Sequence, residues 1–216
     1  MTKFDFPSGP DPDRFTKRID ELKKRLQFAS PDVLAQFTGA TYLPVTEWSG
    51  FFEFNLWNQP IRLSFPEFCV SNQQKERSVP IMDIALILYY FSTSDGTAIK
   101  NKWISFSDLP NGRFYDQAFQ GYSGMLLAQS FREDITRFSK SAEKIGGLVE
   151  NHGDASYKFM ALPRVPILVT YWLGDEDFSA SARILFDASA SHYLPTDAYA
   201  ILGSGLTRQL LKTIKI

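Results

Sequence analysis

The residues that could do chemistry are concentrated between positions 161 and 195, in the stretch ALPRVPILVTYWLGDEDFSASARILFDASASHYLP. This stretch contains Arg164 and His192, and the chain has one other histidine, His152. An imidazole can ligate the metal of a tetrapyrrole or transfer a proton, and a guanidinium can bind a carboxylate or phosphate through two hydrogen bonds. We expect a ligand-binding site made of Arg164, Trp172, Asp187, His192 and Tyr193.

A cluster of acids supports a second hypothesis. Asp175, Glu176 and Asp177 are consecutive, and Asp187 follows the next apolar run. Carboxylate oxygens are the ligands that hard cations prefer, so Asp175, Asp177 and Asp187 form an alternative metal site, with His192 as its acid or base. Each of these residues also has an ordinary structural explanation, as part of a solvated hairpin turn or as a surface or capping histidine. The sequence leaves open which explanation holds and whether the protein is an enzyme.

Several function classes are disfavoured by composition. The chain has 23 basic and 24 acidic residues, so no strong positive field attracts nucleic acid and no polybasic segment suggests an anionic membrane. The single cysteine, Cys69, excludes an internal disulfide and an iron–sulfur cluster within one chain. The sequence contains no glycine-rich phosphate loop, no histidine pair with metal-binding spacing and no nucleophile elbow. Without a signal-peptide pattern or a long apolar run, we expect a cytoplasmic protein.

The elements that position these residues follow from hydrophobic periodicity. After a loose arm at residues 1–10, we expect one α+β domain over residues 11–216. The pattern predicts an amphipathic helix from Pro12, a short helix from Pro31 to near Gly39, and a β-hairpin between residues 50 and 65. Residues 78–91 are apolar on every side, which predicts a buried central helix.

The second half of the chain continues the alternation of helices and strands. Residues 114–145 predict a helical segment that breaks near Gly121 and Gly124, and a last helix follows Pro195. Two strands, at 166–173 and 182–186, should pair in an antiparallel manner across the acidic turn. We expect an α+β fold with a mixed, mostly antiparallel sheet, the buried central helix and flanking helices.

Five short motifs occur in a characteristic order: KWISF at 102–106, LPRVP at 162–166, GDEDF at 174–178, LFD at 185–187 and YLP at 193–195. Together they resemble domain-of-unknown-function family 3786, a bacterial and archaeal group found largely in anaerobes. The resemblance runs from about residue 33 to residue 211 and implies no agreed activity. Some family members resemble fusions to a four-cysteine iron–sulfur segment of corrinoid/iron–sulfur proteins, which this chain lacks.

Three hypotheses about function follow. The first is a non-enzymatic ligand-binding or accessory protein of anaerobic corrinoid, tetrapyrrole or one-carbon metabolism, with a corrinoid or haem as ligand; it is motivated by the resemblance and by an aromatic content of 15%. The second is a metal-assisted hydrolase or transferase that uses the acids above. The third is a protein-interaction module that uses the basic helix at 14–25. The sequence does not indicate the oligomeric state.

Overall fold

The computed structural model describes residues 12–74 and 78–215, and the expected arm at 1–10 lies outside these residues. The α+β class is confirmed, but the strands form two antiparallel sheets instead of one. Contacts within the chain define two compact units, which are described one at a time. The expectation of one domain over 11–216 stays a prediction.

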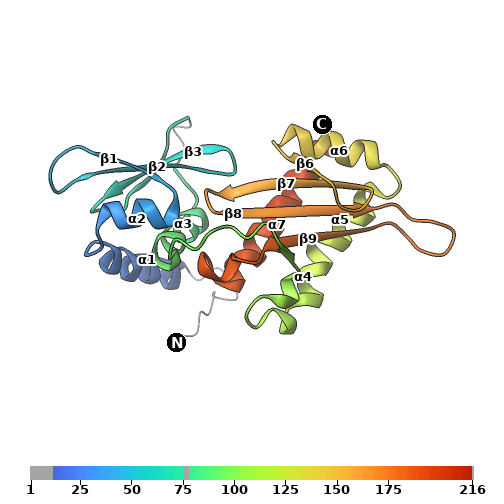
Figure 1. The fold of residues 1–216 in the computed structure, drawn as a ribbon, viewed down its shortest axis with the longest axis horizontal. Helices are drawn as coiled ribbons and strands as arrows, with labels where there is room; N and C mark the ends of the chain where they lie inside the picture. The colour runs from blue at the N-terminus through green and yellow to red at the C-terminus, as the bar shows by residue number, and fades with distance from the viewer. Residues whose placement is uncertain (1–11, 75–77, 216) are drawn as a thin grey trace. The chain divides into compact units, whose positions relative to one another are not determined.

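The first unit contains residues up to 99 together with Ala161–Arg164 and His192–Leu194. It is built from helices and a four-stranded sheet in the order β1-β2-β3-β4 (Figure 1). These elements are α1 (Pro12–Leu26), α2 (Pro31–Thr38), β1 (Thr41–Pro44), β2 (Gly50–Leu56), β3 (Gln59–Phe65), β4 (Val70–Asn72) and α3 (Ile81–Thr93). The predicted hairpin is β2–β3, whose register pairs Phe52 with Leu63 and Phe54 with Ile61.

Helix α3 is the buried helix that the sequence predicts, and its residues from Ala85 to Phe91 are buried. Phe91 lies against the inner face of the sheet, with its ring centroid 5.0 Å from that of Phe52 and 5.4 Å from that of Phe54. The ring of Phe91 is edge-to-face with Phe52 and tilted with respect to Phe54. Such arrangements suit the quadrupoles of aromatic rings and fix the helix on the strands. The C-terminal end of α3 is therefore held firmly, and the loop that follows it carries Asp95.

Helix α1 is amphipathic as its pattern predicts, with Ile19, Leu22 and Leu26 buried. On its basic side, Arg18 donates to Glu21 at 2.7 Å and to the hydroxyl of Tyr89 in α3, also at 2.7 Å. At least Arg18 of the basic face is therefore bound to side chains of the first unit.

The second unit has a five-stranded sheet in the order β5-β9-β8-β7-β6. Its strands are β5 (Trp103–Ile104), β6 (Leu148–Glu150), β7 (Ala155–Leu162), β8 (Val165–Trp172) and β9 (Ser181–Asp187), although the end of β7 belongs to the first unit. The predicted pairing across the acidic turn is β8–β9, in which Ile167 lies opposite Phe186. The motif residues Trp103 and Ile104 pair with Asp187 and Phe186, so β5 forms the edge beside β9.

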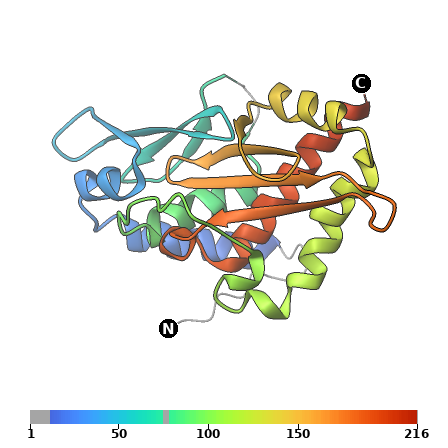
Figure 2. The same cartoon turned by 45° about the vertical axis from the view of Figure 1, so that its right-hand side comes forward.

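One face of this sheet is covered by α4 (Asp116–Tyr122), α5 (Gly124–Phe131), α6 (Ile135–Lys144) and α7 (Thr196–Lys212), as Figures 1 and 2 show. The ring of Phe186 in β9 packs 5.0 Å from that of Tyr199 in α7. Tyr171 in β8 stacks on Phe138 in α6 at 4.8 Å and donates its hydroxyl to the carbonyl of Arg132 at 2.7 Å. The core of this unit lies between the sheet and these helices.

The helical segment over 114–145 breaks once where the sequence predicts and once where it does not. Ser123 separates α4 from α5, between the two expected glycines. A second break follows Phe131, where Arg132 has a φ of 50°. Asp134 then starts α6 by accepting from the backbone N–H of Arg137 at 2.9 Å. The side chain of Asp134 is thus a helix cap. No glycine or proline in the sequence predicted this second break.

Candidate functional site

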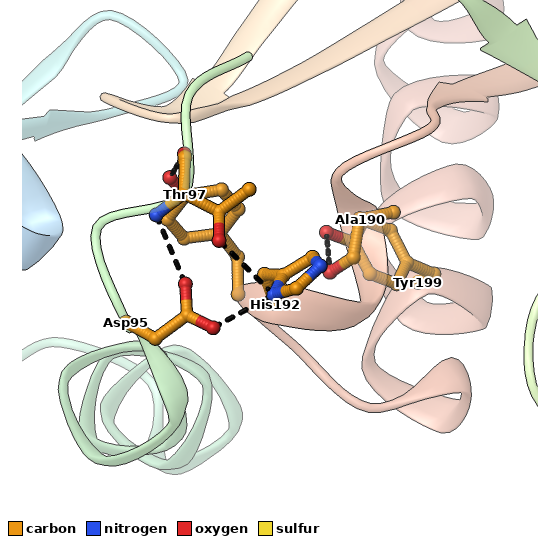
Figure 3. A network of polar contacts seen from close by, with 6 residues as sticks. Asp95, Thr97, Ala190, His192 and Tyr199 are labelled. Atoms are coloured by element: carbon orange, nitrogen blue, oxygen red, sulfur yellow. Dashed lines mark hydrogen bonds and ion pairs between the residues drawn. The ribbon is translucent and has the colours of Figure 1, made fainter. Parts of the chain in front are cut away.

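His192 is held in the first unit by a carboxylate from a distant part of the chain. Its Nδ1 lies 2.7 Å from Oδ2 of Asp95 and 3.1 Å from Oγ1 of Thr97 (Figure 3). His192 ends a short 3-10 helix (Ala190–His192), and both partners lie in the loop after α3. The side chains of His192 and Asp95 are a little under half exposed, so the pair is in contact with solvent.

The loop Asp95–Gly96–Thr97 is shaped to present this carboxylate. Oδ1 of Asp95 accepts from the backbone N–H of Thr97 at 2.9 Å, which leaves Oδ2 for the imidazole. Gly96 has a φ of +80°, and a Cβ at this position would lie 2.9 Å from the ring of Phe37 in α2. Glycine is required here because it tolerates the left-handed backbone and lets the ring approach.

Asp95 is ionised across the physiological range. Desolvation alone would raise its pKa, but hydrogen bonds from His192 and Thr97 outweigh this effect and lower the pKa to about 2. An ionised carboxylate can only accept, so Nδ1 of His192 carries the proton that it donates. The other ring nitrogen, Nε2, therefore keeps its lone pair when the ring is neutral. Such a nitrogen can coordinate a metal or accept a proton.

Tyr193 packs beneath the surface and holds the Asp95–Thr97 loop through its hydroxyl. It is fully buried, and its hydroxyl donates to the backbone carbonyl of Thr97. Its ring lies 6.0 Å from that of Tyr90 in α3. Tyr193 is thus a structural neighbour of the His192 site.

Arg164 is bound to the backbone of the first unit. Its guanidinium donates to the carbonyl of Gln36 near the end of α2 at 3.1 Å, where the helix dipole favours a cation. Its backbone N–H donates to the hydroxyl of Tyr90 at 3.1 Å, and Tyr90 in turn donates to the carbonyl of Thr38. These contacts fix the turn between β7 and β8 and assign Arg164 a structural role.

The two remaining residues of the expected ligand site lie in the second unit and do not come together. Trp172 pairs with Ser181 at one end of the β8–β9 ladder, whereas Asp187 lies past Phe186 at the other end. Six residues of strand separate them along β8, which corresponds to about 20 Å. The five residues therefore do not assemble into one site within either unit.

Asp187 is a buried acid, 1% exposed, that organises the end of β9. Its Oδ1 accepts from the backbone N–H of Lys100 at 2.9 Å, from that of Ser189 at 2.9 Å and from the Ser189 hydroxyl at 2.6 Å. Desolvation opposes ionisation, but the Ser189 side chain and the backbone amides of Lys100, Ser189 and Asn101 lower its pKa. This pattern ties the segment before β5 to the strand.

The alternative metal site is not assembled either. Oδ1 of Asp175 accepts from the backbone N–H groups of Asp177 at 2.9 Å and Phe178 at 2.8 Å, so this acid shapes its own turn. Asp187 lies at the opposite end of β9. In residues 12–74 and 78–215, no group of three or more His, Cys, Asp or Glu side chains could hold a metal ion. Asp175 and Asp177 in the turn are thus not brought together with Asp187.

Sequence reasoning identified His192 but missed Asp95 and Thr97. The dipeptide Asp95-Gly96 predicts only a turn at the exit of α3, and the helix does end just before it, at Thr93. Nothing local connects it to a histidine 97 positions later. The one available signal was that an aspartate in a tight turn has a spare carboxylate oxygen.

The two antiparallel sheets and their helices define an α+β protein. A family model described as domain of unknown function (DUF3786) matches residues 30–209. The chain belongs to this family. No curated protein and no solved structure matches it. Over the described part of the chain, every helix is too short or too polar to cross a membrane.

Proposed function

We propose that the protein is a ligand-binding protein that holds a metallo-tetrapyrrole, a corrinoid or a haem, through Nε2 of His192. The observation that carries the proposal is the 2.7 Å contact between Nδ1 of His192 and Asp95. Histidines that ligate metals characteristically donate their second ring nitrogen to a carboxylate, which fixes the tautomer and makes the ligating nitrogen more basic. The His192 side chain is a little under half exposed, so part of it is in contact with solvent.

The surroundings of the pair suit a large, flat and partly apolar ligand. Phe37 is half-buried beside Gly96, so an aromatic ring lies next to the loop that carries Asp95. An aromatic ring beside this loop offers apolar contact to a macrocycle. The site consists of His192 as ligand, Asp95 and Thr97 as its partners and Phe37 as a neighbour. Arg164, Trp172, Asp187 and Tyr193 are not ligands in this proposal.

The cellular role that we attach to this binding is that of an accessory protein in anaerobic corrinoid or one-carbon metabolism. Its support is an association within the family: some members resemble fusions to a four-cysteine iron–sulfur segment of corrinoid/iron–sulfur proteins. The role depends on the ligand, so binding has to be tested first.

The test is a spectroscopic titration of the purified protein with hydroxocobalamin and, separately, with haemin. Coordination by an imidazole changes the visible spectrum of either ligand, and we expect saturation at micromolar concentrations. His192→Ala should abolish the shift. His152→Ala is the matched control, because His152 lies in an exposed turn and should leave the titration unchanged. Asp95→Ala should weaken binding about 10- to 100-fold, the usual effect of removing the partner of a ligating histidine.

The outcomes separate coordination from adventitious binding. An equal spectral shift for wild type and His192→Ala would show that the ligand binds elsewhere. No shift for either ligand at about tenfold molar excess over the expected micromolar dissociation constant would reject the tetrapyrrole.

A second candidate function, acid–base catalysis in a hydrolase or transferase, is favoured by the same Asp95–His192 pair. A carboxylate that holds an imidazole by Nδ1 prepares Nε2 to accept a proton. Asp175, Asp177 and Asp187 have no part in this version, because they belong to the second unit and the Asp95–His192 pair belongs to the first. Turnover of activated ester or phosphoester substrates that is lost in His192→Ala, without any tetrapyrrole binding, would favour catalysis over the first proposal.

A further inference from the structure

Helices α4 and α5 are apolar on two opposite sides, although only one side packs against their own unit. On the inner side, Phe119, Leu127 and Phe131 are fully or almost fully buried, and Phe119 stacks on Phe106 with ring centroids 4.2 Å apart. A helix of a one-sheet unit normally turns polar residues to the opposite side. Here that side is apolar too.

The outer side carries exposed apolar residues from three consecutive segments, the 3-10 turn Gly112–Phe114, α4 and the start of α5. In and just before α4, a period of 3.6 residues per turn places Tyr115, Ala118 and Tyr122 on one face, and Met125 follows the break at Ser123. The exposed fractions are 83% for Phe114, 61% for Tyr115, 40% for Tyr122 and 54% for Met125. The outer stripe consists of Phe114, Tyr115, Ala118, Gly121, Tyr122 and Met125.

The middle of the outer stripe has little side-chain volume, because its residues are small. Ala118 and Gly121 are exposed, and a Cβ built on Gly121 would meet no atom within 4 Å. Large side chains flank these small residues along the chain: Phe114 and Tyr115 on one side, and Tyr122 and Met125 on the other. Small residues at a helix crossing let two backbones approach, and larger residues on either side can then interdigitate.

We propose that the protein self-associates through this outer stripe, as a weak two-fold dimer in which α4–α5 of one copy crosses α4–α5 of the other. A two-fold axis near residues 118–121 brings the small centres together. It also places Phe114 and Tyr115 of each copy against Tyr122 and Met125 of its partner. The contact is self-complementary, as a two-fold interface must be.

The area of the stripe agrees with a second copy as the occupant. Its four large side chains, scaled by their exposed fractions, offer about 500 Å² of surface on each copy. Two copies would bury about 1,000 Å², the lower limit for a specific interface. The expected dissociation constant is therefore on the order of 10–100 µM.

The experiment is sedimentation equilibrium of the full chain between about 5 and 500 µM, a range that brackets the expected constant. Wild type should pass from the mass of one chain to that of two and stop there. Met125→Lys should weaken the dimer at least about tenfold, because it buries a charge in the stripe. Phe178→Lys is the matched control, since Phe178 is 74% exposed but lies in the loop between β8 and β9.

Gly121→Leu distinguishes a specific crossing from general stickiness. It enlarges the apolar area, so non-specific association would strengthen, whereas the proposed crossing would lose its close approach and weaken about tenfold. Gly205→Leu is the control, because Gly205 in α7 also has nothing within 4 Å of a built Cβ. Thermal melting of each variant shows whether it is folded. A wild type that stays monomeric, an association that grows past the dimer without limit, or a Gly121→Leu dimer that is tighter than wild type would each overturn the proposal.

Discussion

Asp187 should be the most important single acid for stability, and its contribution should depend on pH. One oxygen accepts three hydrogen bonds in a residue that is 1% exposed. A hydrogen bond to a charged group contributes about 1.5–3 kcal/mol to stability. Bonds that share one acceptor together contribute less than the sum of independent bonds. We expect Asp187→Ala to lower the free energy of unfolding by about 3–4 kcal/mol, or the melting temperature by about 10 °C. Asp187→Asn keeps a neutral acceptor oxygen and should cost about 1–2 kcal/mol.

The sign of the pH dependence follows from the direction of the pKa shift. The pKa of Asp187 is lower in the folded protein than in the unfolded chain. Its stabilisation is therefore fully present above the unfolded pKa of about 3.9 and is lost as pH falls through the folded pKa. The difference in unfolding free energy between wild type and Asp187→Asn should be constant from neutral pH down to about pH 5 and shrink in stronger acid.

Urea unfolding, followed by circular dichroism at several pH values, measures both quantities. Asp177→Ala is the matched control, because this exposed acid lies in the turn before β9 and should change stability by less than about 0.5 kcal/mol. The reasoning fails if Asp187→Ala costs less than about 1 kcal/mol at neutral pH, or if the Asp187→Asn difference is the same at about pH 3 as at neutral pH.

Three glycine substitutions should differ in sign and size. Gly96→Ala forces a β-carbon into a left-handed backbone and against Phe37, so we expect a loss of about 1–3 kcal/mol by urea unfolding. Gly112→Ala would place its Cβ 1.9 Å from the carbonyl oxygen of Phe106, and the backbone must shift at a cost of about 3 kcal/mol or more. Gly205→Ala, in open space within α7, should instead raise stability by about 0.5–1 kcal/mol; a loss there would show that the helix contacts something at this point.

The elements with a strong local period could be predicted from sequence. The stripe of α1, the apolar run of α3 and the alternation in β3 each encode burial within about ten residues, so they specify their own structure. The division of the strands between two sheets could not be predicted, because it depends on pairings between distant segments. Trp103 pairs with Asp187, and β1 is a short strand whose four residues are mostly exposed and show no alternation.

The polar residues show the same limit more sharply. Asp187, Arg164 and Asp175 are all possible ligands by sequence, yet each is hydrogen-bonded to backbone groups that a sequence pattern does not display. Backbone N–H and C=O groups outnumber ligands, and a buried or turn-forming polar side chain satisfies them first. His192 differs because its partner is a side chain from a distant loop, and because that partner engages only one of its two nitrogens. A ring held in this way keeps its orientation and still has one nitrogen to offer, which is why the search for the ligand should begin at His192.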